Sequence, residues 1–209
     1  MGMILYIYGA AAFSYLYVSI TAMHTKLREH IEKIVQLTDD EFEFVLSNFS
    51  FRKLKKHQFL IQQGDPVHYS YFVVSGLLKL SHTDANDKEH ILHFAMEDWW
   101  VSDYKAYFTN AKATMSLDCL EDTSVFCLSL EDNVKLCSSL PKMEHFFLTK
   151  SHFGYIASQQ RILSLLTTSA KERYEQLLMQ YPSLMQRVNK TLLASYLGVS
   201  RETLSRLSS

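Results

Sequence analysis

The pattern of apolar and polar residues divides the chain into a strand-rich part and a helical part. Between residues 50 and 130, short apolar runs alternate with turn signals such as Gly64-Asp65-Pro66 and Ser75-Gly76. Several short strands at such intervals predict an antiparallel barrel or roll. The expected strands cover residues 71–74, 77–80, 90–94 and 125–128.

Helical spacing occurs on both sides of this block. Upstream of it, Thr38 and Glu41 form the capping-box pattern that opens a short helix. After Pro141, apolar residues recur every three or four positions, which predicts a helix of about 25 residues, roughly 38 Å long. A helix of this length cannot bury its whole apolar stripe on one small roll. A further helix is expected at residues 170–181, where Pro182 ends it.

The last stretch, residues 190–209, fits the spacing of a helix-turn-helix. Where the two helices must cross closely, a small residue is needed, and Ala194 stands there. The turn needs a residue that tolerates positive φ, which Gly198 supplies, and Ser200 stands where the second helix needs an N-cap. An ordinary amphipathic hairpin does not require Ala194 and Gly198 at these offsets. The five positions that must be apolar hold Leu193, Leu197, Val199, Leu204 and Leu207.

The second helix of such a unit lies in the major groove and presents its first turns to the base edges. An Arg side chain forks onto guanine, and a Glu side chain accepts from cytosine. The side chains in these turns are Arg201, Glu202, Thr203, Ser205 and, further along, Arg206. We expect these five residues to bind DNA, with Lys190 at the start of the first helix as a phosphate contact.

This segment closely resembles the recognition element of the Crp/Fnr family of transcription regulators, in the run Gly198-Val199-Ser200-Arg201-Glu202-Thr203-Leu204-Ser205-Arg206. The family reads DNA with an Arg-Glu pair at the start of this helix and an Arg four residues after the Glu. The resemblance therefore implies base readout by Arg201, Glu202 and Arg206.

The charge of the whole chain gives no general attraction to DNA, because the net charge is −1. The C-terminal stretch differs. Residues 183–209 carry four basic side chains against one acidic one, a local balance of +3, from Arg187, Lys190, Arg201 and Arg206 against Glu202. We expect this modest positive patch to contact phosphates, and a dimer would double it.

The strand-rich part resembles the cyclic-nucleotide-binding-type β-roll of the same family. The matching residues are Phe59-Leu60-Ile61, Gly64-Asp65, Tyr71-Phe72-Val73-Val74, Gly76 and Trp99-Trp100. With the helix-turn-helix, the resemblance covers about residues 27–209. It implies an α+β fold with an antiparallel, jelly-roll-like sensor domain, a long dimerisation helix and a C-terminal helix-turn-helix of winged-helix type. In the family the long helix pairs with its twin across a two-fold axis, whereas the apolar pattern alone also allows an intramolecular core.

The segment that corresponds to the family's cyclic-AMP contacts departs from the family pattern at three positions. Asp103 replaces a Glu that is one methylene longer, Ser102 replaces a Gly, and Lys112 stands at or next to an Arg whose planar fork it lacks. Cyclic AMP is therefore not expected as a ligand, and no cofactor is predicted. For another small ligand, the candidate contacts are Asp103, Lys112, Ala113 and Thr114.

No enzyme chemistry is predicted. His90 and His93, with Glu97 nearby, suggest a metal site, but residues three apart on a strand point to opposite faces. The sequence contains neither a nucleophile elbow nor a phosphate loop. The three cysteines form no C-x-x-C pair, and none precedes position 119, which argues against the iron–sulfur branch of the resembled family. They are expected to be packed, reduced thiols. We thus expect no catalytic residue and no metal.

Residues 3–23 carry no charge, and they are long enough to span a bilayer as a helix. Four tyrosines weaken that interpretation, and the lack of Lys or Arg before the apolar run disfavours a signal peptide. Three interpretations stay open for this extension: a misplaced start before Met23, a membrane anchor, and a packed helix. The expected division is an apolar extension at 1–23, the roll at 24–140, the dimerisation helix at 141–168 and the helix-turn-helix at 169–209.

The sequence thus predicts a cytoplasmic, homodimeric, sequence-specific regulator of Crp/Fnr type that reads a pseudo-palindromic site in double-stranded DNA. RNA polymerase and an unidentified small-molecule effector are further candidate partners. The alternative is a ligand-binding or membrane-tethered sensory module with a vestigial DNA-binding part. The sequence stops three residues after Arg206, whereas members of the family commonly continue, and this keeps the alternative open.

Overall fold

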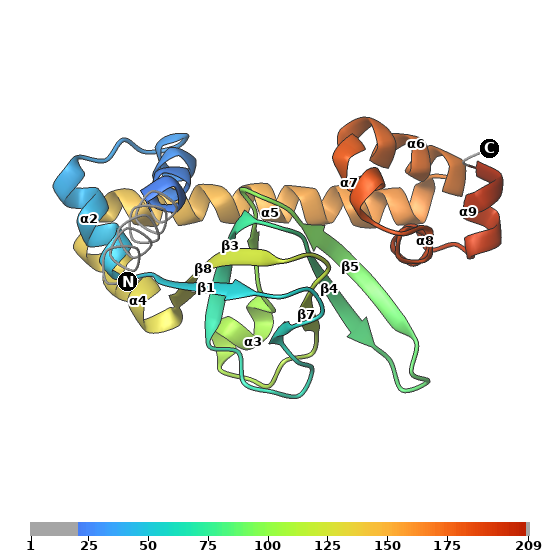
Figure 1. Ribbon diagram of the computed structural model, residues 1–209, viewed down its shortest axis with the longest axis horizontal. Coiled ribbons are helices and arrows are strands. Elements are labelled where there is room, and N and C mark those ends of the chain that lie inside the picture. Colours follow the sequence, from blue (N-terminus) through green and yellow to red (C-terminus); the bar gives the residue numbers. More distant parts are fainter. Residues whose placement is uncertain (1–20, 208–209) are drawn as a thin grey trace, which may run out of the picture.

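The computed structural model describes residues 21–207. The apolar extension predicted at 1–23 therefore lies almost wholly outside the described residues. No helix within the described part of the chain is both long enough and apolar enough to cross a membrane. Figure 1 shows a β-roll flanked by helices at both ends, with one long helix running past all of it.

The predicted roll is confirmed as two four-stranded antiparallel sheets. One sheet has the order β1 (Ser50–Leu54), β8 (Thr123–Ser129), β3 (Tyr69–Ser75) and β6 (Trp100–Val101). The other has the order β2 (Phe59–Ile61), β7 (Ser116–Cys119), β4 (Leu78–Thr83) and β5 (Glu89–Ala95). The four strands expected from the apolar runs correspond to β3, β4, β5 and β8.

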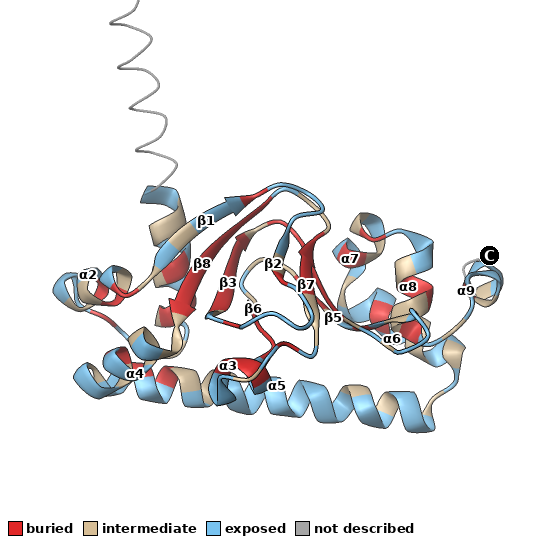
Figure 2. Cartoon of the chain, turned by 90° about the horizontal axis from the view of Figure 1, so that it is seen from below, coloured by how far each residue is buried: buried red, intermediate tan, exposed pale blue. Residues whose placement is uncertain are grey.

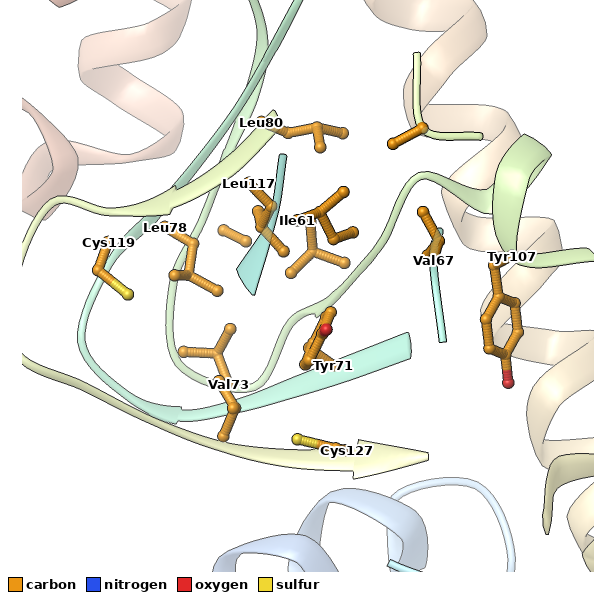
Figure 3. Packing of buried hydrophobic residues seen from close by; sticks show 14 of the residues in the cluster. Ile61, Val67, Tyr71, Val73, Leu78, Leu80, Tyr107, Leu117, Cys119 and Cys127 are labelled. Atoms are coloured by element: carbon orange, nitrogen blue, oxygen red, sulfur yellow. The ribbon is translucent and has the colours of Figure 1, made fainter. Parts of the chain in front are cut away.

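The space between the two sheets is filled by apolar side chains from both of them (Figure 3). Val73, Leu78 and Leu117 are among those with no or almost no exposed surface. The link from β3 to β4 requires Gly76, whose φ is +100° and where a Cβ would lie 2.4 Å from Thr123 Oγ1. The chain can therefore pass so close to β8 only because residue 76 has no side chain.

A second apolar cluster covers the outer face of the first sheet, where Phe72, Val74 and Phe126 point outward. The elements packed there are a helix at residues 21–32, α2 (Asp39–Ser47), α4 (Leu130–Ser139) and the start of α5 (Pro141–Thr167). The predicted capping box of α2 is confirmed, with the Thr38 hydroxyl and the Glu41 carboxylate each accepting from the other's backbone N–H.

The predicted long helix is confirmed as α5, whose 27 residues extend about 40 Å. It begins with Pro141 at a position where proline costs no hydrogen bond. All of residues 151–160 are exposed, and Figure 2 shows this middle part of the helix in pale blue.

The C-terminal region consists of α6 (Ala170–Gln180), α7 (Pro182–Arg187), α8 (Lys190–Leu197) and α9 (Arg201–Leu207). Pro182 both ends the predicted helix and starts α7. The described residues after Ser129 contain no strand, so this part of the chain shows the helix-turn-helix without the wing that a winged helix has.

Among the described residues, His30 is an unusual buried side chain in the helical cluster. It is 3% exposed, and its Nε2 accepts a hydrogen bond of 3.2 Å from the Trp100 indole. Burial, together with the positive charge of Lys150, lowers the pKa of His30 from 6.5 to about 4. Between these two values the unfolded chain binds a proton that the folded protein does not.

Acidification is therefore expected to destabilise the protein through His30. The contribution of the neutral imidazole is complete above pH 6.5 and is lost as the pH falls toward 4, by about 2 kcal/mol at pH 5. His30→Gln keeps an acceptor for Trp100 but cannot titrate, so its free energy of unfolding should fall less between pH 7.5 and pH 5. Urea denaturation at both pH values measures this, with the exposed His145→Gln as control. Equal acid sensitivity in the wild type and His30→Gln would contradict it.

Candidate nucleic-acid interface

The turn between α8 and α9 has the geometry that the sequence predicted. Gly198 ends α8 in the left-handed conformation, with φ 71° and ψ 34°. The backbone N–H groups of Gly198 and Val199 then close the helix onto the carbonyls of Ser195 and Ala194 at 3.1 and 3.0 Å. Glycine favours this conformation because it has no Cβ to meet the following carbonyl.

Both helices of the unit have side-chain caps at their start. The Ser200 hydroxyl accepts from the Thr203 backbone N–H at 3.1 Å, as the cap assignment predicted. The Asn189 side chain caps α8 by accepting from the Leu192 N–H at 3.0 Å. The sequence reasoning missed the Asn189 cap, although Asn one residue before a helix is a usual capping signal.

The angle between α8 and α9 is filled by the expected apolar side chains. Leu193, Ala194, Leu197 and Leu204 are buried, and Val199 packs against them. These residues continue into an apolar cluster that includes Leu77, Ile91 and Phe94 of the roll. The helix-turn-helix therefore packs directly on β5 and on the turn before β4 (Leu78–Thr83).

The outward side of α9 carries the residues expected to read DNA. Arg201, Glu202, Ser205 and Arg206 are exposed, whereas Thr203 is half-buried and its hydroxyl lies 3.1 Å from that of Ser200. Hydrogen bonds from its own backbone N–H and from Ser200, and the positive charges of Arg201 and Arg206, lower the pKa of Glu202. Glu202 is thus a carboxylate acceptor at neutral pH.

The basic residues of the positive patch predicted for residues 183–209 do not all face solvent on one side of the helix-turn-helix. Lys190 at the start of α8 is exposed. Arg187 turns to the roll, where it pairs with Glu97 at 2.8 Å and Glu121 at 2.7 Å. The expectation that Arg187 adds to the DNA-facing charge is therefore wrong for this arrangement, because two carboxylates neutralise it.

The candidate ligand residues lie around α3 (Tyr104–Thr109). Asp103 is fully buried and caps this helix by accepting from the Ala106 N–H at 3.1 Å. Its second oxygen accepts from the Thr114 N–H, the Thr114 hydroxyl and the Met115 N–H, at 2.7, 2.9 and 3.2 Å. These four hydrogen bonds give the carboxylate a structural role in joining α3 to the segment before β7.

The other candidate ligand residues differ in exposure. Ala113 is buried, and Lys112 and Thr114 are exposed. Lys112 pairs with Pro66 in an isolated β-bridge. Ligand binding by these four residues stays a prediction.

The histidines and cysteines do not gather into a metal site. His90 is exposed, with Nε2 2.8 Å from Asp84 Oδ2. His93 pairs with Leu80 of β4, and a register shift between Leu80 and Ser81 separates this pair from the pair that His90 forms with His82. Within residues 21–207, no group of three His, Cys, Asp or Glu side chains could hold a metal ion. Cys119 and Cys127 are buried, which raises the pKa of each thiol to about 11. Such thiols are poor nucleophiles at neutral pH.

Comparison with known proteins identifies the family. Residues 51–139 match the family model described as a cyclic nucleotide-binding domain. A transcriptional activator protein named anr, from Pseudomonas aeruginosa, is 30% identical over 172 residues, which cover 75% of this chain and 68% of that protein.

The chain belongs to the Crp/Fnr family of transcription regulators. It is a family of regulators and not of enzymes, as the sequence predicted, and membership implies DNA binding.

Solved structures agree with this fold. FixK2 from Bradyrhizobium japonicum superposes with a TM-score of 0.68 at 16% identity, over 77% of this chain and 82% of that one. A protein from Eubacterium rectale that is described as a regulator of the Crp/Fnr family gives a TM-score of 0.64 at 14% identity, over 82% of both chains. At these identities the likeness concerns the fold alone.

Two glycines of this Crp/Fnr protein should respond in opposite ways to the same change. Gly198→Ala puts a Cβ into a left-handed conformation and should lower the free energy of unfolding by about 1–2 kcal/mol. Gly154→Ala, inside α5 with open space around it, should raise that free energy by about 0.5–1 kcal/mol. Denaturant unfolding of both variants beside the wild type measures this. Equal effects would contradict the role of Gly198 in the turn.

Proposed function

We propose that this Crp/Fnr protein is a sequence-specific, dimeric regulator that reads a pseudo-palindromic DNA site with α9. The observation that carries the proposal is the capped α8–Gly198–α9 unit, whose outer side exposes Arg201, Glu202 and Arg206. Arg and Glu at the start of a recognition helix can bind guanine and cytosine edges in the major groove. As a DNA-binding regulator it would act in the cytoplasm.

Lys190 has a different role in this proposal. It stands at the first position of α8 and is exposed, at the helix end where backbone N–H groups favour an anion. We therefore assign it to a phosphate, a contact that adds affinity without reading sequence.

A dimer is supported by the apolar side of α5. Large exposed apolar side chains recur along it, mostly seven residues (two helical turns) apart, and Tyr155 and Leu166 are 66% and 78% exposed. The members of this stripe are Leu148, Tyr155, Ile156, Ile162, Leu163 and Leu166. A continuous apolar stripe of this length on a soluble helix fits a partner helix, and a two-fold pair is the commonest arrangement.

Base readout is tested by substitutions in α9. Arg201→Ala and Arg206→Ala should each weaken binding to the best site by about 1–3 kcal/mol and relax the preference at one base pair in each half-site. Lys190→Ala should weaken all sequences alike and reduce the salt dependence by about one counterion per half-site.

The measurement is selection from random duplex DNA with purified full-length protein, followed by titration of the selected site at several salt concentrations. Recovery of a two-fold motif supports the proposal. If Arg201→Ala and Lys190→Ala both lost the same affinity for all sequences and kept the wild-type specificity, readout by α9 would be contradicted. Recovery of no motif by the wild type would favour the sensory-module alternative.

Dimerisation is tested on the stripe of α5. Ile162→Arg places a charge in the proposed contact between two helices and should shift the protein from dimer to monomer at micromolar concentration in sedimentation equilibrium. Met179→Arg on α6 is the control, because Met179 is also a large apolar residue and is 84% exposed, but lies outside the stripe. A dimer that survives Ile162→Arg would place the interface elsewhere.

A further inference from the structure

We propose that Arg187 is a positioning residue: by holding the C-terminal helices on the roll, it sets the half-site spacing that the dimer accepts. This inference rests on the proposed function, and it concerns a residue that does not itself touch DNA. It is carried by the contacts of Arg187 and of a second arginine, Arg161, at the junction between the roll, α5 and the helix-turn-helix.

The guanidinium of Arg187 donates to two carboxylates of the roll, each of them through two hydrogen bonds. Nη1 and Nη2 donate to Glu97 at 2.8 and 3.1 Å, and Nε and Nη2 donate to Glu121 at 3.0 and 2.7 Å. Glu97 stands between β5 and β6, and Glu121 between β7 and β8. Arg187 is the last residue of α7, so this contact joins two separate loops of the roll to the C-terminal helices.

The carboxylates are themselves held in place. Glu97 Oε1 also accepts from the backbone N–H of Gly76 at 2.8 Å. Burial raises the pKa of Glu97, but hydrogen bonds from Arg187 and Gly76 outweigh this and hold the pKa below its usual value. A planar fork between two fixed carboxylates defines an orientation, which a single ammonium group would not do.

Arg161 makes the corresponding contact from α5. Its guanidinium lies 3.7 Å from the centre of the Tyr196 ring of α8 and donates to the Tyr196 carbonyl at 2.8 Å. It also donates to the Ile91 carbonyl of β5 at 3.3 Å. Arg161 thus joins the long helix, the roll and the first helix of the helix-turn-helix at one point.

These contacts leave the reading side of α9 open. Arg201, Glu202 and Arg206 are exposed while Arg187 is paired with the roll. The docked arrangement is therefore compatible with DNA binding and does not cover the recognition helix. Since Arg187 already donates to two carboxylates, its role in this arrangement is orientation and not phosphate binding.

Orientation of this kind has a definite consequence in a dimer. If α5 pairs about a two-fold axis, the contacts of Arg161 and Arg187 fix α9 relative to that axis. A change of one base pair between the half-sites moves one half-site relative to the other by about 3.4 Å and turns it by about 35°. A rigidly held recognition helix cannot adjust to this shift and rotation and loses contacts with its half-site. A loosely held helix can move with the half-site and keep these contacts.

The test is binding to a set of duplexes that carry the selected half-site at spacings from three base pairs below to three above the preferred one. For the wild type we expect binding about tenfold weaker for a change of one base pair. Arg187→Gln, Arg187→Lys and the double variant Glu97→Gln/Glu121→Gln should each reduce this difference to less than about threefold, with binding to a single half-site unchanged. Arg52→Gln on β1, the same change at an exposed site of the roll, should bind as the wild type does.

A phosphate contact gives a different result. Arg187→Gln would then weaken binding at every spacing and reduce its salt dependence, while the double glutamate variant would keep the wild-type preference. That outcome, or an unchanged spacing preference in all variants, overturns the proposal.

A second measurement needs no DNA. Spin labels at Lys135→Cys on α4 and Met179→Cys on α6, in a Cys137→Ser background, report the distance between these two helices. Labelled protein is diluted with unlabelled protein so that only distances within one chain are measured. We expect a narrow distribution in the wild type and a broad one in Arg187→Gln. Equal distributions overturn the positioning role. If the wild type binds no DNA but Arg187→Gln broadens the distribution, the proposed function fails, and the spacing role with it, while the holding role of Arg187 stands.

Discussion

The position of the helix-turn-helix depends on apolar packing between the C-terminal helices, β5 and the turn before β4. Leu77, Ile91 and Phe94 belong to the roll by sequence, yet they share a buried cluster with side chains of α6 to α9. Burial of each such side chain contributes about 1.5–3 kcal/mol. The long helix α5 cannot fix this region alone, because residues 151–160 along its middle are exposed. The arrangement of the reading helix is therefore decided by a contact between segments about a hundred residues apart.

Polar groups beside this packing give the contact a single geometry. Apolar surfaces attract without much directional preference, whereas the forked contacts of Arg187 and Arg161 allow one orientation. On the same side of the roll, Lys79 pairs with Glu89 at 2.5 Å and Asp118 at 3.4 Å, and the Ser195 hydroxyl of α8 donates to the Glu89 carbonyl. Burial raises the pKa of Asp118, and the positive charge of Lys79 partly offsets this rise. Pairing with Lys79 therefore favours the charged form of this buried carboxylate.

Several features of the C-terminal unit could be predicted because they are local. The turn at Gly198, the cap at Ser200 and the apolar positions Leu193 and Leu204 depend on residues within a few positions of one another. The same is true of the capping box of α2 and of the strand pattern of the roll. The resemblance in these segments was therefore enough to identify the family, because the family's motifs consist of the same short-range features.

The sequence by itself determined the elements, their order and the side chains that α9 exposes, because helix periodicity, caps and turn residues act over short distances. It could not determine what Arg187 and Asp103 do. Arg187 was counted with the DNA-facing charge and is paired with Glu97 and Glu121. Asp103 was a candidate ligand contact, and its carboxylate accepts from Thr114 and Met115. Only the tertiary structure decided these roles, because the partner of a charged side chain is whichever opposite group the fold brings within about 3 Å, and that group has no fixed offset in the sequence.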